Sequence, residues 1–244
     1  MESKGILIGP DGHGGVATTD ARPGECAPPA RRGRPCQIAE PERRQLLLDA
    51  AEAVFVELGY SAASMDDIAR GAGMSKKTLY RLFETKQSLF AAVIAARRAS
   101  LNPTIDGGDC PDVATAREIL RRHLLRVARF ALAPRQAALY RLVIAESQRT
   151  PEIAHAFHRE GPVKARAPLI EWLAVQRERG ILRVADPASA ASMLFSMVIS
   201  DPQMRLLIGE MRAPDDALIE QRVDRAVDLF LHGAAPRDDY VNGA

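Results

Sequence analysis

The sequence of 244 residues predicts an all-α fold, and three observations carry this prediction. Apolar residues recur at the i, i+3 and i+4 spacing of helices through most of the chain. Start signals such as Pro41 and Pro151, and stop signals such as Gly59 and Gly180, punctuate this pattern. No stretch alternates apolar and polar residues for long enough to form a strand, since the candidate at 181–184 is too short.

Local signals place each helix in turn. Pro41 suits the first turn of a helix that stops at Gly59, and prolines 134, 151 and 187 mark later starts. Pairs of helix-breaking residues at 102–103 and 107–108 separate the first four helices from the rest. The expected helices span residues 41–58, 64–72, 75–83, 86–100, 114–133, 134–146, 150–157, 163–179, 188–200 and 215–232.

Residues 64–83 are predicted to form two short helices joined by a tight turn, which is the arrangement of a helix-turn-helix unit. Ser64 can cap the first helix, and two aspartates follow it at the positive end of the helix dipole. Gly73 permits the turn because glycine has no side chain to clash. Ser75 can cap the second helix, which is rich in hydrogen-bond donors.

Those donors suit DNA. Lys76 and Lys77 lie near the helix start, where they can donate to guanine O6 and N7 in the major groove. The hydroxyls of Thr78 and Tyr80 suit phosphate oxygens, as does the ammonium of Lys86 at the start of the fourth helix. A merely solvated basic face is the alternative, but the caps, the turn glycine and the basic helix together favour DNA binding. The expected DNA-contacting residues are Arg34, Ser64, Ser75, Lys76, Lys77, Thr78, Tyr80, Arg81 and Lys86.

The distribution of charge agrees with this placement. Residues 31–98 carry twelve Lys and Arg against eight Asp and Glu, whereas residues 99–244 balance. The basic segment 31–35 can lay Arg34 in a narrow, electronegative minor groove, or it can be a plain basic linker, and the sequence leaves both open. Because no apolar run is long enough for a membrane span and no signal pattern is present, we expect a cytoplasmic protein that does not contact membranes.

The second half of the chain is expected to bind a small molecule and to form a homodimer. Pockets are apolar with a few polar anchors, although such side chains also fill ordinary cores. The candidate pocket residues are Phe130, Tyr140, Glu146, Phe157, Trp172, Met193 and Met197, with Arg141 as a further candidate anchor. Two apolar stripes, at 191–198 and 219–230, could pair with a second copy in a four-helix interface or pack within one chain.

Other chemistries find little support. His155 and His158 share a helix face with Glu152, but no fourth ligand is apparent, so we expect an exposed polar face and no metal. The cysteines at 26, 36 and 110 have no metal-ligand spacing and are expected to be reduced thiols. No nucleophile carries a recognisable local signature, and we therefore expect neither catalysis nor a cofactor.

From about residue 41 to residue 98 the chain resembles the DNA-binding domain of the TetR/AcrR family of regulators. The segments that carry the resemblance are Leu48–Phe55, Gly59–Tyr60, Asp67–Ala69, Gly73–Ser75, Thr78–Tyr80 and Phe83–Lys86. The stretches 142–149, 180–183 and 186–187 are more weakly similar to the C-terminal domain of the AefR-like branch.

The resemblance implies an all-α homodimer that binds a palindromic operator, usually as a repressor released by a small ligand. By position it places Lys76 and Lys77 at base-reading sites, and it places Ser64, Thr78, Tyr80 and Lys86 at contacts with the DNA backbone. Leu82 stands where the family often has histidine, so one phosphate contact is expected to be lost.

We therefore expect a tail at 1–36, a DNA-binding domain at 37–100, a helical ligand-binding and dimerisation domain at 101–232, and a second tail at 233–244. In the first domain three helices pack together, the second and third of which form the helix-turn-helix unit, and a fourth helix joins this domain to the second domain. The expected function is sequence-specific transcriptional regulation, with double-stranded operator DNA and an unidentified small-molecule effector as partners. The alternatives are a ligand-dependent activator and a helical ligand-binding protein without DNA affinity.

Overall fold

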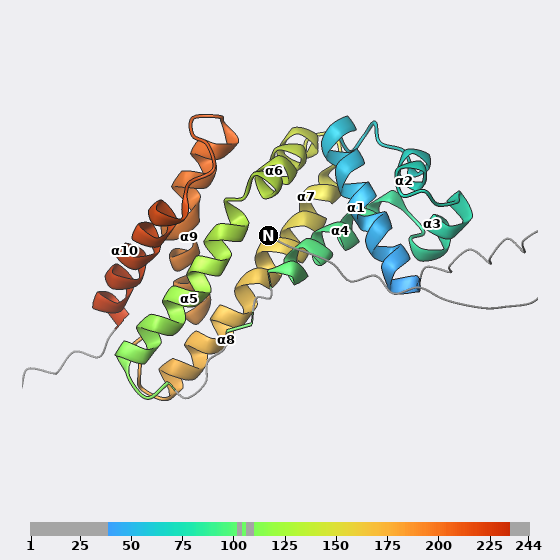
Figure 1. Cartoon of the computed structure of the whole chain (residues 1–244). Helices are drawn as coiled ribbons and strands as arrows, with labels where there is room; N and C mark the ends of the chain where they lie inside the picture. Colours follow the sequence, from blue (N-terminus) through green and yellow to red (C-terminus); the bar gives the residue numbers. More distant parts are fainter. Residues whose placement is uncertain (1–38, 102–103, 106–109, 235–244) are drawn as a thin grey trace, which may run out of the picture. The chain divides into compact units, whose positions relative to one another are not determined.

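The computed structural model describes residues 39–101, 104–105 and 110–234, and these residues are all-α, as predicted (Figure 1). Within these ranges there are ten α-helices and one π-helix, and no strand. The expected N-terminal tail with Arg34, the helix-breaking pairs at 102–103 and 107–108, and residues 235–244 lie outside the described part. The described residues belong to one compact unit.

The first four helices pack around an aromatic centre. They are α1 (Glu40–Leu58), α2 (Met65–Gly71), α3 (Lys76–Leu82) and α4 (Lys86–Ser100). The rings of Phe55, Tyr60 and Phe90 lie with centroids 5.4 to 5.6 Å apart and mostly meet edge to face, an arrangement that stabilises beyond simple burial. Leu79 is fully buried and fixes α3 against this core.

Seven further helices follow in the described part of the chain. They are α5 (Val113–Ala131), α6 (Pro134–Glu146), α7 (Pro151–His158), the π-helix η1 (Arg159–Val163), α8 (Lys164–Glu178), α9 (Pro187–Leu207) and α10 (Asp216–Ala234). Figure 1 shows α5 alongside α10, and these two helices pack against each other. Arginines on α5 pair with acidic residues on α10, for example Arg121 with Asp224 at 2.7 Å and Arg129 with Asp216 at 2.9 Å.

Helix α9 continues well past residue 200, where the sequence predicted that it would end. Pro202 lies inside the helix and cannot donate to the carbonyl of Val198 four residues earlier. The side chain of Arg222 on α10 replaces that donor, because its Nε donates to the Val198 carbonyl at 3.0 Å. A contact from a distant helix therefore allows α9 to continue through this proline.

The predicted gap between residues 157 and 163 is also helical. Residue 158 ends α7, and residues 159–163 form η1, which joins α7 to α8 and contains Pro162. Single π-turns of this kind occur often at functional sites. Arg98 of α4 donates to the Glu160 carbonyl at 3.0 Å, which ties this turn to the fourth helix.

The core of the first four helices is continuous with that of α6 and α7. Leu139, Ile153 and Phe157 are buried in the same cluster as Phe55 and Phe90. The domain boundary at residue 100 remains a prediction, but residues on both sides of it pack in one hydrophobic core.

Most of the two stripes predicted to form a dimer interface are instead buried within the single chain. Leu194 and Val198 of α9 and Val223 and Val227 of α10 pack in a common core with α5 and α8. That prediction is wrong for these residues, because their side chains have no surface left for a partner. No helix in the described part of the chain is long and apolar enough to cross a membrane.

Candidate nucleic-acid interface and ligand cavity

Helix α2 is fixed at its start by reciprocal hydrogen bonds, as the sequence predicted for Ser64. The Asp67 N–H donates to Ser64 Oγ at 3.1 Å, and the Ser64 N–H donates to Asp67 Oδ2 at 3.2 Å. Donation from Ser64 lowers the pKa of the Asp67 carboxyl. After α2, the Met74 N–H donates to the Ala69 carbonyl at 2.8 Å, and Gly73 adopts a φ of 63° that glycine accommodates best.

Helix α3 is capped as predicted and presents a polar face. Ser75 Oγ accepts from the Thr78 N–H at 3.1 Å, and the two hydroxyls lie 2.9 Å apart. Lys76, Lys77 and Tyr80 are exposed, with Tyr80 retaining 49% of its surface. The helix therefore offers its donors to the solvent while its apolar side is held in the core.

The basic side chains on this face of α3 form only weak ion pairs within the chain. Lys76 pairs with Asp66 on α2, and Arg81 pairs with Glu40 at 3.8 Å. Both pairs are exposed, so each contributes about 0–1 kcal/mol and can be exchanged for a phosphate at little cost. Lys77 makes no hydrogen bond or ion pair with any described residue.

Lys86 lies differently from the expected phosphate contact. Its ammonium donates to the carbonyls of Tyr60 at 2.8 Å, Ala63 at 2.9 Å and Ser61 at 3.3 Å. An ammonium has three donors, and all three are engaged here. In this arrangement Lys86 fixes the loop between α1 and α2 instead of pointing toward the solvent.

A cavity of about 80 Å³ lies among α4, α5, α6, η1, α8 and α9. Its wall is largely apolar and includes the aromatic rings of Phe130, Tyr140 and Phe195. Tyr140 is mostly buried, and this burial raises the pKa of its phenol. The charged residues that line the cavity, Arg97 and Arg98, both come from α4.

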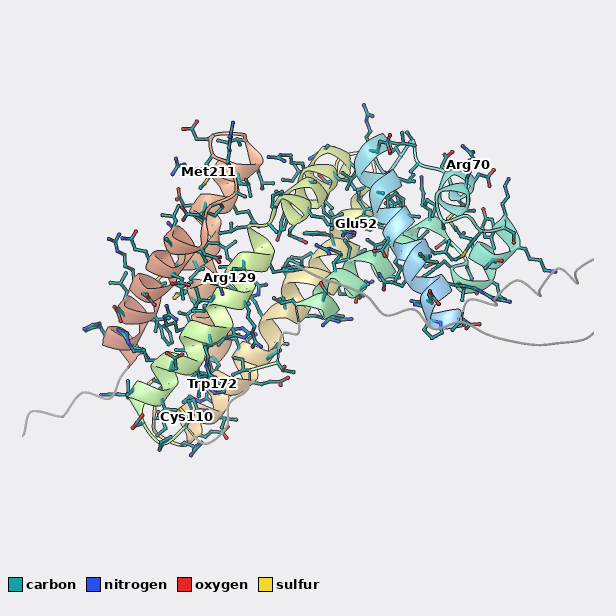
Figure 2. All side chains as sticks on the ribbon, viewed as in Figure 1. Glu52, Arg70, Cys110, Arg129, Trp172 and Met211 are labelled. Carbon is teal, nitrogen blue, oxygen red and sulfur yellow. The ribbon has the colours of Figure 1, made fainter. Side chains whose placement is uncertain are left out.

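An ion-pair network connects this cavity to the helix-turn-helix unit. Glu52 on α1 is buried, and Arg135 of α6 donates to both of its carboxylate oxygens, at 2.6 and 2.7 Å. Arg97 approaches the same carboxylate from α4 with its Nε 3.6 Å from Oε1. Figure 2 shows Glu52 on α1 at the level where α6 packs against it. One carboxylate therefore joins three helices.

Four residues of this region were not predicted from the sequence, namely Glu52, Arg97, Gln136 and Gln203. A signal was present for the first two, because Glu52 follows Leu48 by four residues and precedes Phe55 by three. Arg97 likewise continues the apolar series of Phe90, Val93 and Ile94 on α4. A charged residue inside an apolar stripe indicates a buried partner. The two glutamines carry no comparable signal.

Two family models match the chain. Residues 47–93 match the model described as bacterial regulatory proteins, tetR family, and residues 118–233 match the AefR-like transcriptional repressor, C-terminal domain. The chain belongs to the TetR family. The resemblance identified from the sequence is thus confirmed in both halves of the chain.

Curated relatives agree with this assignment. The HTH-type transcriptional activator FasR of Mycolicibacterium smegmatis is 46% identical over 79 residues, a match that covers 32% of this chain and 36% of FasR. The chain thus matches about a third of the length of that TetR relative.

Solved structures show the fold over a longer stretch. The flavonoid-responsive regulator FrrA is 31% identical with a TM-score of 0.65, over 80% of this chain and 98% of FrrA. A TetR transcriptional regulator from Agrobacterium tumefaciens is 26% identical with a TM-score of 0.67, over 80% of this chain and 95% of that one. The protein is a TetR-type, DNA-binding helix-turn-helix regulator of transcription.

The cavity of this TetR chain contains only part of the predicted pocket. Phe130 and Tyr140 line the cavity. Phe157 does not line it but contacts the Tyr140 ring edge to face, with ring centroids 4.6 Å apart. Trp172 belongs instead to the core that includes Cys110, and Figure 2 shows both near the same end of α5 and α8. The apolar spacing was read correctly, but Trp172 lies about two turns beyond the cavity residue Ala165 on α8.

Four further candidates are also displaced from the cavity. Met193 is 64% exposed, and together with Met197 it lines a surface hollow between α9 and α10. Glu146 accepts a hydrogen bond from Ser61 at the end of α6, which places it beside the loop between α1 and α2. Arg141 donates to the Leu207 carbonyl at 2.9 Å and so caps the end of α9. Helix periodicity does not reveal which neighbouring helix each face contacts, so the sequence could not place these side chains relative to this cavity.

His155 and His158 are exposed on α7. No group of three or more His, Cys, Asp or Glu side chains within the described ranges could hold a metal ion.

Proposed function

We propose that this TetR-family regulator binds a palindromic operator as a homodimer and acts in the cytoplasm as a repressor released by a small-molecule effector. The observation that carries the proposal is the capped, exposed helix α3, whose basic side chains are bound only by weak surface ion pairs. Such a helix is suited to enter the major groove.

The contacts divide by chemistry. Lys76 and Lys77, in the first turn of α3, read bases by donating to guanine O6 and N7. Arg34 enters the minor groove. The other predicted residues contact the phosphate backbone, namely Ser64, Ser75, Thr78, Tyr80 and Arg81. Lys86 acts by fixing the loop between α1 and α2, and through it the placement of Ser64.

Dimerisation uses an apolar face that the single chain leaves uncovered. Met193, Met204 and Ile208, on α9 and at its end, are 64%, 59% and 70% exposed, and Leu218 and Leu229 of α10 are 48% and 69% exposed. Exposed apolar side chains gathered on two neighbouring helices favour a partner surface. A two-fold dimer places two α3 helices about 34 Å apart, one DNA turn, which matches a palindromic site.

The effector acts through the cavity beside α4. Helix α4 contributes both to the helix-turn-helix core, through Phe90, and to the cavity wall, through Ile94 and Arg97. A ligand that fits the cavity only when α4 shifts stabilises the shifted state and separates the two DNA-reading helices. A 100-fold loss of operator affinity requires about 2.7 kcal/mol of coupling. Ligand response is supported by FrrA, which is named as a flavonoid-responsive regulator.

An activator with the same DNA-binding helices is the second candidate. The observation in its favour is the name of FasR, a transcriptional activator that shares 46% identity over 79 residues. Sign of regulation is decided by the position of the operator relative to the promoter, so a reporter carrying the native promoter distinguishes the two. Loss of the regulator should raise expression for a repressor and lower it for an activator.

A gel-shift salt titration tests DNA binding itself. Operator fragments are first selected by pulling down fragmented DNA from the organism that encodes the protein. We expect the logarithm of affinity to fall linearly with the logarithm of salt concentration, with a slope of about −0.9 per phosphate contact. A protein that binds no duplex even at low salt would instead be a helical ligand-binding protein without DNA affinity.

A further inference from the structure

The cavity among α4, α5, α6 and α9 contains buried polar atoms without a hydrogen-bond partner in the described part of the chain. They are Nε of Arg97, Nε2 of Gln203 and Oε1 of Gln136. All three residues line the cavity, and Gln136 retains only 7% of its surface. An unsatisfied buried polar group costs about 1–3 kcal/mol. Arg97 Nε and Gln203 Nε2 are donors, and they indicate a ligand that supplies an acceptor, whereas Gln136 Oε1 is itself an acceptor.

The charges around the cavity determine the sign of that ligand. Arg97 and Arg98 line it, and no acidic residue does. The Nε of Arg98 is already satisfied by the Glu160 carbonyl at 3.0 Å. The Nε of Arg97 has only the Glu52 carboxylate at 3.6 Å, which is too long for a hydrogen bond. Arg97 is therefore the cation that can receive an anionic group.

Glu52 does not need Arg97. Its two carboxylate oxygens accept from Arg135 at 2.6 and 2.7 Å, in the two-pronged geometry that is the strongest between these groups. If a second carboxylate entered the cavity, Arg97 could turn toward it while Glu52 remained paired. The ion pair from α1 to α6 would be kept, and the ion pair from α1 to α4 would be lost.

The side chains that line the cavity determine the polarity and shape of the uncharged part of the ligand. Phe130, Tyr140 and Phe195 surround the space together with aliphatic side chains, so the body is apolar and a ring fits it well. The cavity holds about 80 Å³, which is less than the roughly 150 Å³ of a cavity known to bind benzene. A ring-sized ligand must therefore push the walls apart, and α4 is one of them.

We propose that this cavity binds a small monocarboxylate with a ring-sized apolar body, and that Arg97 binds its carboxylate in exchange for Glu52. This proposal rests on the proposed effector role of the cavity and names the chemical class of the effector. Gln203 and Tyr140 lie in the same wall, where their side chains interact with each other. Carboxylate binding by Arg97 is the step that breaks the ion pair between α4 and α1.

The test compares three ring-sized probes that differ in charge: benzoate, benzamide and benzylamine. Thermal unfolding of the full chain is measured with each probe, and their affinities are obtained by calorimetry. We expect benzoate to raise the unfolding temperature and to bind more tightly than the neutral amide, with no stabilisation by the amine. In Arg97→Gln the affinity for benzoate should fall roughly 10-fold to 100-fold, to that of benzamide.

Two further variants locate the effect. Arg122→Gln removes an equal charge from the exposed face of α5 and should leave the preference for benzoate intact. Ala165→Leu fills the cavity from α8 and should abolish binding of benzoate and benzamide alike. If Arg97→Gln were poorly folded, the Ala165→Leu variant would still decide whether the probes bind in this cavity.

A gel shift with the selected operator in the same samples separates this proposal from the proposed function. Benzoate should weaken operator binding by the wild type and much less by Arg97→Gln. Equal stabilisation by benzoate and benzamide, an unchanged preference in Arg97→Gln, or no binding of any probe would overturn the carboxylate assignment while operator binding stood. Absence of operator binding without any probe would overturn the proposed function instead, whatever the probes do.

Discussion

The Lys77 ammonium is exposed in the first turn of α3 and makes no ion pair with a described residue, whereas its neighbour Lys76 pairs with Asp66. Replacing Lys77 by alanine should therefore cost the DNA complex about 1–3 kcal/mol and relax the base preference at one position of the operator. Competition gel shifts with single-base variants of the operator measure both effects.

Lys164→Ala is the matched control, since Lys164 is an exposed lysine on α8 that pairs with Glu160. Its loss should leave operator affinity and base preference unchanged. If Lys77→Ala weakens all duplexes equally, Lys77 binds phosphate and the assignment to a base is wrong.

Lys86 is expected to matter for stability as much as for DNA. Replacing it by alanine removes the donor for three carbonyls in the loop between α1 and α2, so the free energy of unfolding should fall by about 1–3 kcal/mol. Urea unfolding measures this change. Gln87→Ala, at the next and exposed position, should leave the midpoint in place. A Lys86→Ala protein as stable as the wild type would show that the ammonium is free to bind phosphate after all.

His123 predicts a dependence of stability on pH. It is 1% exposed, and burial followed by repulsion from Arg126 lowers its pKa from 6.5 to about 4. Because the unfolded chain takes up this proton below pH 6.5 and the folded chain does not, stability is full above that pH and is lost as the pH falls toward 4, by about 3 kcal/mol.

His123→Leu should flatten that part of the stability profile, measured by urea unfolding across the pH range. His155→Leu changes an exposed histidine on α7 and should leave the slope as in the wild type. The two profiles must differ for the interpretation of His123 to hold.

At the scale of the helices, the sequence predicted starts more accurately than ends. Ser64 and Ser75 cap helices as expected, because a cap depends only on residues two or three positions away. The end of α9 was placed too early, since the helix continues through Pro202, whose missing backbone donor is replaced by Arg222 from α10. A signal that depends on a residue distant in the chain cannot be read from one segment.

The exposed face of α9 and α10 supports a prediction about association. Leu229→Asp puts a charge on a side chain that is 69% exposed yet is expected to be buried between two subunits. The dissociation constant of the dimer should rise at least tenfold, because an unpaired charge in an apolar interface costs more than 1.4 kcal/mol. Sedimentation at several concentrations measures the equilibrium.

Val175→Asp is the control for this variant. Val175 is 47% exposed on α8, outside the proposed interface, and its replacement should leave association unchanged. If both variants, or neither, dissociate, the interface lies elsewhere.

At the scale of the whole molecule, Glu52 joins the DNA-reading part of the chain to the rest. Arg135→Gln would leave this buried carboxylate with Arg97 alone, and the unfolding free energy should fall by about 3 kcal/mol. Arg149→Gln, an exposed arginine after α6, is the control and should change stability by less than about 0.5 kcal/mol. Thermal and urea unfolding compare the two, and equal stabilities would show that water can replace Arg135.

The all-α fold, the helix-turn-helix unit and its exposed donors could be predicted because helix periodicity and caps are local. The cavity could not, because its wall combines residues such as Arg97, Gln136 and Gln203 that are far apart in the sequence. Phe130 and Tyr140, which the sequence analysis named as pocket candidates, line the cavity. Trp172 and Met193 were named on the same grounds but contact other parts of the chain.

The shared core beneath α1, α4, α6 and α7 has a consequence for genetics. Leu139 and Phe157 pack in the same core as α1 and α4, against which α3 is held. Substitutions at such positions, far from the operator-binding surface, should therefore destabilise the packing of α3 at raised temperature. Screens for heat-sensitive alleles should therefore recover changes in α6 and α7 alongside those in the reading helix. Cutting the chain at residue 100 would remove part of that support, so a shortened reporter fusion would lose occupancy at its promoter even with every DNA-facing side chain intact.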